Sequence, residues 1–127
     1  MNTNDADLTR EIFGEAIYSY SRAQALTDGV LVDVSRAAAR AGFRYPVAVT
    51  AGLWGRIDID DGVNPRSVTC MHRLGNVLLR ALEAIRAVGN RDTDRVEFEA
   101  LGCALWAHCG PGDTAAPVIT IMREGED

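Results

Sequence analysis

The sequence contains no lysine, few aromatic residues and only three cysteines. Arginine supplies all thirteen basic residues, which we attribute mainly to a GC-rich coding bias. An odd number of cysteines without framework spacing argues against a secreted disulfide scaffold, so we expect a cytoplasmic protein. No apolar run reaches the roughly 18–20 residues that a membrane span requires. Residues 1–7 are polar and acidic, and we therefore expect no signal peptide.

Acidic residues outnumber basic ones, and the formal net charge is −5. This balance argues against direct nucleic-acid binding through bulk electrostatics. The 127 residues are 47% hydrophobic and 24% charged, which is ordinary globular composition. We expect a single domain over residues 1–127, with residues 1–7 and 123–127 frayed.

The clearest element predicted from the sequence is a long helix at residues 65–88. Asn64 is a good N-cap, and Pro65 suits the first helical position. Apolar residues then recur at steps of three and four, at Val68, Met71, Leu74, Leu78, Ala81, Leu82, Ile85 and Val88. We expect this face to form the spine of the core, with Leu78 and Leu82 fully buried at its centre.

Upstream of the long helix the patterns predict only short elements. Helices are predicted at residues 7–13, 36–41 and 46–54, and strands at 16–20 and 30–34. Ser21 and Gln24 have the spacing of a capping box, which opens a brief helix ending at Gly29. Ser35 is predicted to cap the helix at 36–41, and Gly55 to break the helix at 46–54.

Downstream of the long helix the pattern changes to strands. Residues 96–99 alternate cleanly, and the alternation continues on the opposite parity at Leu101, Cys103, Leu105, Ala107 and Cys109. A bulge near Gly102 would reconcile the two phases within one strand. Turn residues at 110–113 precede a final strand at 117–122, which predicts an antiparallel hairpin. The fold class is therefore α+β, with a small mostly antiparallel sheet and a C-terminal β-hairpin packed on one long helix and several short helices.

Two stretches carry a family resemblance. Residues 13–34 read FGEAIYSYSRAQALTDGVLVDV, and the second stretch runs from GPGD at 110–113 through PVITIM at 117–122 to residue 127. They resemble a domain-of-unknown-function family of small proteins carried by phages, plasmids and integrative elements of bacteria. The resemblance implies a mobile-element setting. It implies no chemistry and carries over no catalytic residues.

Side chains that bind metals are present but not in ligand spacing. The possible zinc ligands are Cys70, His72, Cys103, His108 and Cys109. No Cys-x-x-Cys or His-x3–5-His pair occurs, and we interpret Cys103 and Cys109 as small apolar residues on the buried face of a strand. The three aspartates at 58, 60 and 61 lack the spacing of a calcium loop. The sequence therefore predicts no metal and no cofactor.

Glu97 and Glu99 offer an enzymatic alternative. Two glutamates flanking one strand residue resemble the catalytic motif of ADP-ribosyltransferases, and residues 18–31 faintly resemble the opening of that fold. Alternation alone places both glutamates on the solvent face of a half-buried strand. No serine-threonine strand or stacking aromatic completes such a site. A small enzyme with a reduced ADP-ribosyltransferase-like fold is the alternative, and no catalytic residue is assigned.

Nine residues are candidate contacts with a binding partner. They are Tyr18, Tyr20, Arg22, Asp58, Asp60, Asp61, Arg66, Arg73 and Arg80. The last three step by seven and form a stripe along the long helix, although a solvated helix face is the simpler interpretation. Tyrosine and arginine are enriched at interface hot spots, and the aspartates lie close enough to mimic successive phosphates.

The sequence thus predicts a non-enzymatic accessory protein of a phage or other mobile element. Its expected partner is a protein or ribonucleoprotein complex of the host, because an acidic protein can occupy a basic nucleic-acid channel. The sharpest form of this prediction is an inhibitor of a host defence system, similar to an anti-CRISPR protein. A homodimer is left open.

Overall fold

The computed structural model describes residues 20–89 and 94–126. The helix predicted at 7–13 and most of the strand predicted at 16–20 lie outside the described residues. The described residues form four helices and five strands, which confirms the α+β fold class. In chain order they are α1 (Arg22–Asp28), β1 (Leu31–Asp33), α2 (Ser35–Ala41), β2 (Val47–Thr50), α3 (Ala51–Ile57), α4 (Arg66–Val88), β3 (Arg95–Ala100), β4 (Cys103–Pro111) and β5 (Pro117–Arg123).

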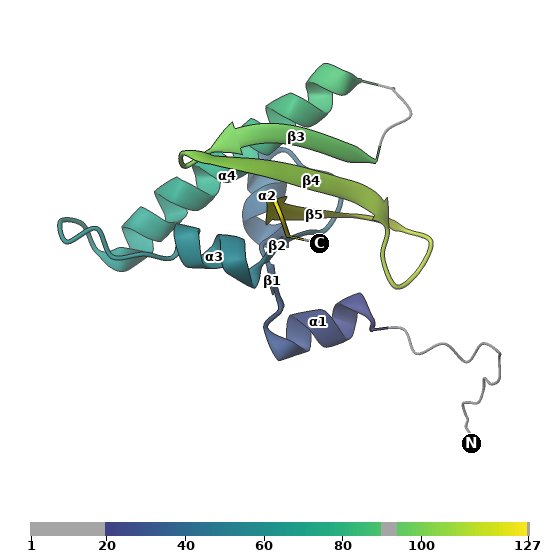
Figure 1. Cartoon of the computed structure of the whole chain (residues 1–127), viewed down its shortest axis with the longest axis horizontal. Helices are drawn as coiled ribbons and strands as arrows, with labels where there is room; N and C mark the ends of the chain where they lie inside the picture. The colour runs from purple at the N-terminus through teal and green to yellow at the C-terminus, as the bar shows by residue number, and fades with distance from the viewer. Residues whose placement is uncertain (1–19, 90–93, 127) are drawn as a thin grey trace.

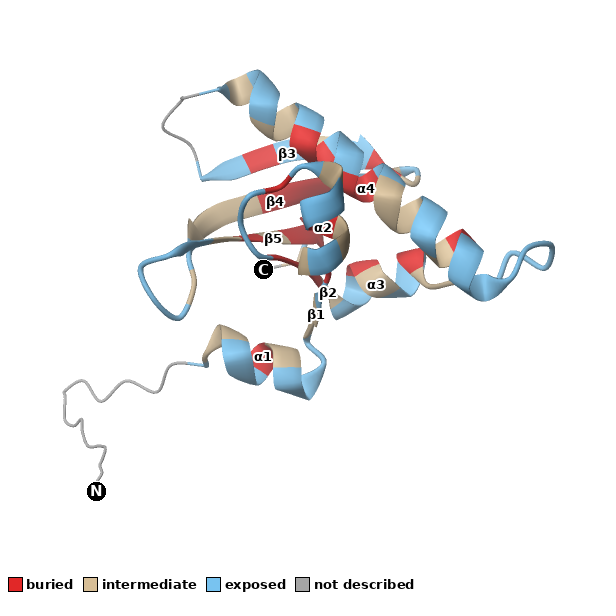
Figure 2. Cartoon of the chain, turned by 180° about the vertical axis from the view of Figure 1, so that it is seen from behind, coloured by how far each residue is buried: buried red, intermediate tan, exposed pale blue. Residues whose placement is uncertain are grey.

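The strands form one sheet in the order β1-β2-β5-β4-β3 (Figure 1). Every neighbouring pair is antiparallel except β2 and β5, which run parallel. Helices α2, α3 and α4 lie against one face of the sheet (Figure 2), and α1 packs beside β1. The predicted mostly antiparallel sheet and C-terminal hairpin, β4 with β5, are confirmed.

The core lies between the sheet and its three covering helices. It includes Leu53 and Ile57 of α3, Ile121 of β5, and Leu78 and Leu82 of α4. The last two are 1% and 8% exposed, so the prediction that α4 forms the spine of the core is confirmed at its centre. Burying side chains of this size is the main favourable contribution to folding.

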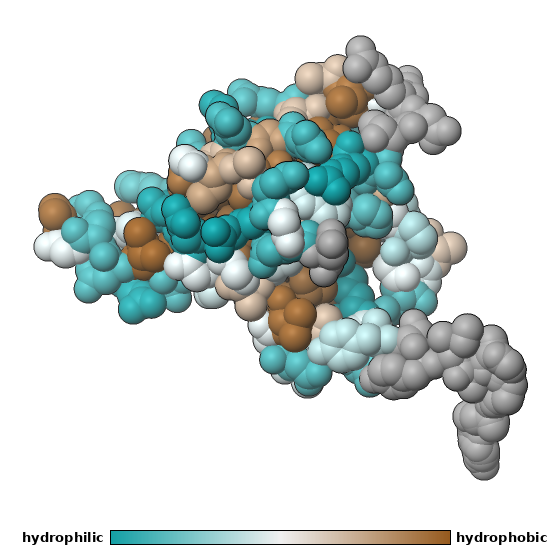
Figure 3. Space-filling model, viewed as in Figure 1, coloured by the Kyte–Doolittle hydropathy of each residue, from teal (hydrophilic) through white to brown (hydrophobic). Residues whose placement is uncertain are grey.

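The first half of α4 departs from the predicted apolar face. Val68 and Met71 are 38% and 66% exposed, whereas Thr69 is buried and Cys70 half-buried. Here α4 extends beyond the sheet, and the contacts of its start are with α3 and the preceding loop. These supports lie on the side of the helix that carries Thr69. Apolar side chains are therefore exposed beside hydrophilic ones on the surface of the molecule at the end where α4 begins (Figure 3).

The helix predicted at 46–54 is wrong, because Val47–Thr50 is strand β2. This strand pairs with β1 on one side and β5 on the other, and Val47, Ala48 and Val49 are all buried. A strand with both faces covered reads as a continuous apolar run rather than an alternation. The helix begins only at Ala51, where the Thr50 hydroxyl accepts the Leu53 N–H at 3.2 Å. Gly55, the predicted break, lies inside α3.

The bulge predicted near Gly102 is also wrong. Leu101 and Gly102 form a two-residue turn with φ of 56° and 70°, and Ala100 pairs directly with Cys103. Consecutive positive φ values are typical of the type I′ turns that join hairpin strands. The change of parity therefore marks two separate strands, β3 and β4, rather than one strand with an insertion.

The predicted helix caps are partly confirmed. Ser21 and Gln24 form the complete capping box of α1, and Gly29 ends that helix with φ of 80°. Ser35 is the first residue of α2 rather than its cap, because its hydroxyl donates to Asp33 at 2.6 Å and accepts the Val47 N–H at 3.0 Å. At the start of α4 the N-cap residue is Pro65 rather than the predicted Asn64. The Asn64 side chain donates to Asp61 instead.

Candidate functional site

A hollow of about 640 Å³ lies at one end of the sheet. It opens between the end of α4, the loop after α2 and the turn that joins β4 to β5. We call it the end cavity. Its apolar walls include Phe43, Leu82, Ile85, Val96 and Ile119. Both its size and its mainly apolar lining are those of sites that bind ligands or a partner's side chain.

Two arginines supply the positive charge of the end cavity. Arg44 follows α2, and Arg86 lies in the last turn of α4; neither has an ion pair with any described residue. The Arg86 guanidinium lies beside Gly42, 3.5 Å from the position a Cβ would take there. Gly42 is the residue at which α2 ends, with φ of 117°. The Arg86 guanidinium therefore lies at the C-terminal end of α2, where the free carbonyl groups of the helix attract positive charge. The cavity therefore combines apolar walls with cations at a helix terminus.

Cys109 also lines the end cavity but is not an activated nucleophile. Burial, followed by the nearby Asp94 carboxylate, raises the pKa of its thiol. A thiol with a raised pKa stays protonated near neutral pH, and the thiolate is the reactive form. The exposed aromatic side chain at the cavity is Tyr45, which is 48% exposed. The geometry thus favours binding over covalent chemistry.

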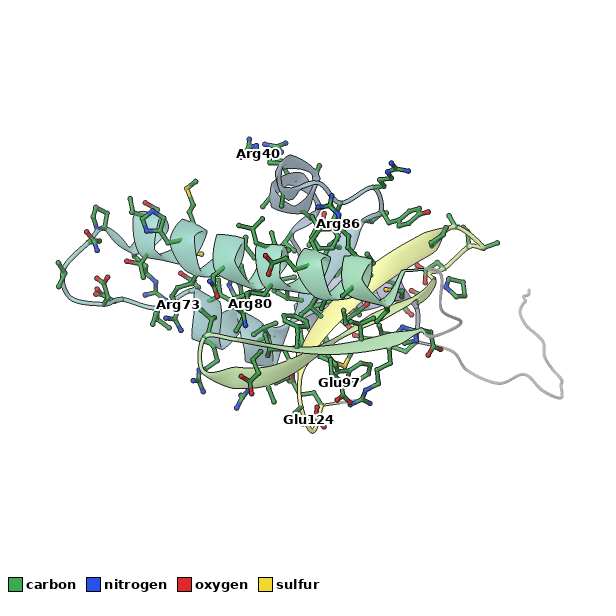
Figure 4. The ribbon with its side chains drawn as sticks, turned by 90° about the horizontal axis from the view of Figure 1, so that it is seen from above. Arg40, Arg73, Arg80, Arg86, Glu97 and Glu124 are labelled. Atoms are coloured by element: carbon green, nitrogen blue, oxygen red, sulfur yellow. The ribbon has the colours of Figure 1, made fainter. Side chains whose placement is uncertain are left out.

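The helical side of the molecule exposes arginine side chains. Arg40 and Arg86 lie on the side of α2 and α4, whereas Glu97 and Glu124 lie on the opposite side, beyond the sheet (Figure 4), where both pair with Arg95 at 3.5 Å. Arg36 and Arg40 are exposed on one face of α2. The helical side can therefore receive an acidic partner even though the whole chain is acidic.

The predicted arginine stripe of α4 contacts neighbouring segments of the chain. Arg66 pairs with the Asp58 carboxylate at 3.0 Å. Arg73 donates from Nε to the Arg56 carbonyl at 2.8 Å, and Arg80 donates from Nε to the Glu99 carbonyl at 3.1 Å. These bonds connect α4 to α3 and β3. Partner binding by Arg66, Arg73 and Arg80 stays a prediction.

The three predicted aspartates organise the loop before α4. Asp61 accepts the backbone N–H groups of Asn64 and Val63, each at 2.9 Å, and the Thr69 hydroxyl at 3.1 Å. These bonds, the two backbone ones first, lower the pKa of the Asp61 carboxyl from 3.8 to about 2. Asp60 accepts the Gly62 N–H. The aspartates are therefore arranged by local bonds, and contact with a partner stays a prediction.

We expect Asp61→Ala to lower the melting temperature at neutral pH, because the loop loses its main acceptor. The folded-state pKa lies below the unfolded value, so the contribution of this carboxylate is complete above about pH 4 and is lost as the pH falls toward 2. Melting curves of both proteins across this range should converge at the acid end. Asp60→Ala, which removes one bond, is the control with a smaller effect. A difference in melting temperature between the two proteins that stays constant down to pH 2 would contradict the lowered pKa of Asp61.

The predicted tyrosine–arginine patch lies at α1, with Tyr18 outside the described residues. The Tyr20 hydroxyl donates to Asp28 at 2.6 Å, and Arg22 donates to the Thr120 hydroxyl at 2.6 Å and the Ile119 carbonyl at 3.0 Å. Both residues line a second hollow, of about 670 Å³, together with Asp113. Arg22 therefore fastens α1 to β5, and its binding role stays a prediction.

Asp113 completes the attachment of α1. Its two carboxylate oxygens accept the N–H groups of Arg22 and Ala23 at 2.7 and 2.9 Å. We expect Asp113→Ala to lower the free energy of unfolding by about 1–2 kcal/mol, since an anion bonded to a helix N-terminus is lost. Chemical denaturation measures the loss, and limited proteolysis should show faster cleavage within α1. Thr114→Ala is the control, and equal effects of the two changes would count against this role.

The enzymatic candidates are not gathered into one site. Glu97 and Glu99 are exposed on β3, as predicted, and neither lines either hollow. Glu97 pairs with Arg95 at 3.5 Å. All three cysteines are free and half-buried, and residues 20–89 and 94–126 contain no group of three or more possible metal ligands.

The residues of the end cavity were not predicted as a site. They come from the loop after α2, the end of α4 and the β4–β5 hairpin, and no local pattern brings these segments together. The signal that the sequence offers is Phe43, a large apolar residue directly after the glycine that ends α2, and it is buried in the structure. Comparison with protein-family models, with curated proteins and with solved structures found no match to this chain. None of the helices described has the length and apolar character needed to cross a membrane.

Proposed function

We propose that this chain is a non-enzymatic accessory protein of a phage or other mobile element that binds a host protein. The observation that carries the proposal is the end cavity, in which apolar walls meet the cations of Arg44 and Arg86. The resemblance of residues 13–34 and 110–127 supports the mobile-element setting. In its most specific form the partner belongs to a host defence complex, and the chain is an anti-CRISPR-like inhibitor.

The partner segment that fits the end cavity is acidic and carries an apolar side chain. A guanidinium binds a carboxylate through two parallel hydrogen bonds, so Arg44 and Arg86 suit aspartate or glutamate. The apolar walls suit one anchoring side chain, and Tyr45 at the rim adds the kind of contact area that dominates interface hot spots. Nucleic acid is the poorer fit, because the net charge of −5 opposes a polyanion.

The test is an affinity capture from host lysate with tagged protein, followed by binding measurements with the partner identified. Arg86→Glu is expected to weaken binding by about 2 kcal/mol or more, roughly thirty-fold, as at a hot spot. Arg56→Glu is the matched control, since Arg56 is exposed on α3 outside the cavity. Binding should also weaken at high salt, because exposed charges are screened over about 8 Å at physiological ionic strength.

Three outcomes would contradict the proposal. Equal affinities of Arg86→Glu and Arg56→Glu would place the contact elsewhere. Binding of nuclease-treated protein to nucleic acid alone would change the partner class. Loss of activity in Glu99→Gln at unchanged affinity would favour the enzymatic alternative, in which Glu99 acts on a substrate.

A further inference from the structure

The first half of α4 presents exposed apolar side chains on one side. Val68, Met71 and Leu79 are 38%, 66% and 54% exposed. With Gly75 they occupy helical positions separated by three and four residues, which fall on one face. We call these four residues the α4 stripe. Large apolar side chains grouped in this way are typical of interaction surfaces rather than of solvated helix faces.

No contact with another described residue explains the glycine at position 75. A Cβ at this position would meet no atom within 4 Å, and the backbone there is ordinary helix. Glycine in a helix interior is destabilising relative to alanine, and a close approach of another backbone is one reason for a helix to carry it. Among residues 20–89 and 94–126 nothing makes that approach. The space beside Gly75 is therefore open to a second molecule.

We propose that the α4 stripe is the contact between two copies of this chain, related by a two-fold axis at Gly75. A two-fold contact requires a surface that is complementary to itself. Met71 and Leu79 lie four positions before and after Gly75. When two α4 helices cross antiparallel at this glycine, Met71 of each copy meets Leu79 of the other. The missing side chain at the axis lets the two backbones come close.

Charge favours the same antiparallel arrangement. The acidic loop with Asp60 and Asp61 lies before the first residue of α4, whereas α2, with Arg36 and Arg40 exposed, packs along α4 where Leu82 lies. Reversing the direction of the second copy turns its acidic loop toward α2 of the first. A parallel arrangement would instead place the two acidic loops together. This contact does not depend on the proposed function, because it uses neither Arg44 nor the cavity walls.

The test measures the mass of the full chain in solution by sedimentation across concentrations that bracket a Kd of about 1 μM. Toward the upper end of this range the wild-type protein should approach twice the chain mass of 13.7 kDa. Gly75→Glu should raise the Kd at least about tenfold, and so remain largely monomeric at concentrations a few times the wild-type Kd, because two like charges meet at the axis. Glutamate is a better helix former than glycine and finds open space there, so the fold is retained and circular dichroism should be unchanged.

Gly55 provides matched controls. It lies in α3, and a Cβ there also meets open space, so Gly55→Glu should remain a dimer. Gly75→Cys should form a disulfide-linked dimer on mild oxidation, since a residue on the axis lies against its own copy, and Gly55→Cys should not. A monomeric wild-type protein, a dimeric Gly75→Glu variant, or equal cross-linking of the two cysteine variants would each overturn the proposal.

Discussion

Leu78→Ala is expected to lower the free energy of unfolding by about 2–5 kcal/mol. Leu78 is 1% exposed and lies in the middle of α4, within the core between this helix and the sheet. Removing its terminal carbons loses their burial and leaves a cavity that the surrounding helices and strands fill only in part. Chemical denaturation followed by far-ultraviolet circular dichroism measures the loss.

The neighbouring Leu79→Ala is the control for this prediction. It is the same substitution in the same helix, but Leu79 is 54% exposed, so the change should cost much less. Both variants are measured at low protein concentration, where contact between copies does not contribute. Losses of similar size at the two positions would show that α4 is not the spine of the core.

Trp106→Ala is expected to have the other large effect, about 3–5 kcal/mol. Trp106 lies on the sheet face opposite Leu105 and is nevertheless only 7% exposed. Its cross-strand partner is Met122, the guanidinium carbon of Arg95 lies 3.9 Å from its ring centroid, and His108 meets it edge-on. The substitution removes the side chain around which these groups pack on that face.

Trp106→Phe separates ring packing from hydrogen bonding. The buried Trp106 Nε1 has no hydrogen-bond partner among the described residues. Phenylalanine keeps an aromatic ring beneath Arg95 and removes an unsatisfied donor, so its cost should be far smaller than that of alanine. Denaturation midpoints of the two variants give the comparison. If phenylalanine is as costly as alanine, the indole N–H is bonded in solution and the packing argument fails.

The elements that were predicted correctly depend on local chemistry. The capping box at Ser21 and Gln24 needs only four consecutive residues, and the positive φ of Gly29 follows from the absence of a Cβ. The centre of α4 was predicted because eight apolar residues repeat over more than five turns. Such a repeat specifies a helix whatever packs against it.

The elements that were mispredicted depend on distant parts of the chain. Strand β2 has three apolar residues in a row because β1 and β5 cover its edges and both of its faces are buried. Before that context is known, the same residues fit a helix, with Val47, Ala51 and Trp54 on one face. The hairpin turn at Leu101 was missed because a non-glycine residue with positive φ is uncommon.

The candidate site residues likewise divide into those that local sequence patterns predict and those that depend on distant parts of the chain. Spacing placed Arg66, Arg73 and Arg80 correctly on one side of α4, but it did not show that each donates to a neighbouring segment. The end cavity joins segments from residue 42 to residue 119, so no window of sequence contains it. Gly75 lies within the helix predicted at 65–88, and the open space beside it can be seen only in the structure.

The parallel pairing of β2 with β5 also constrains when the chain can fold. Val47 and Ile119 are partners although about 70 residues separate them, and β2 has no other neighbour on that side. Contacts between such distant residues are costly to form, which slows folding. During synthesis β5 leaves the ribosome after the other four strands, so β1 and β2 wait with an unpaired edge until β5 emerges. Shortening the chain before residue 117 should therefore yield a product that aggregates or needs a chaperone, rather than a smaller folded domain.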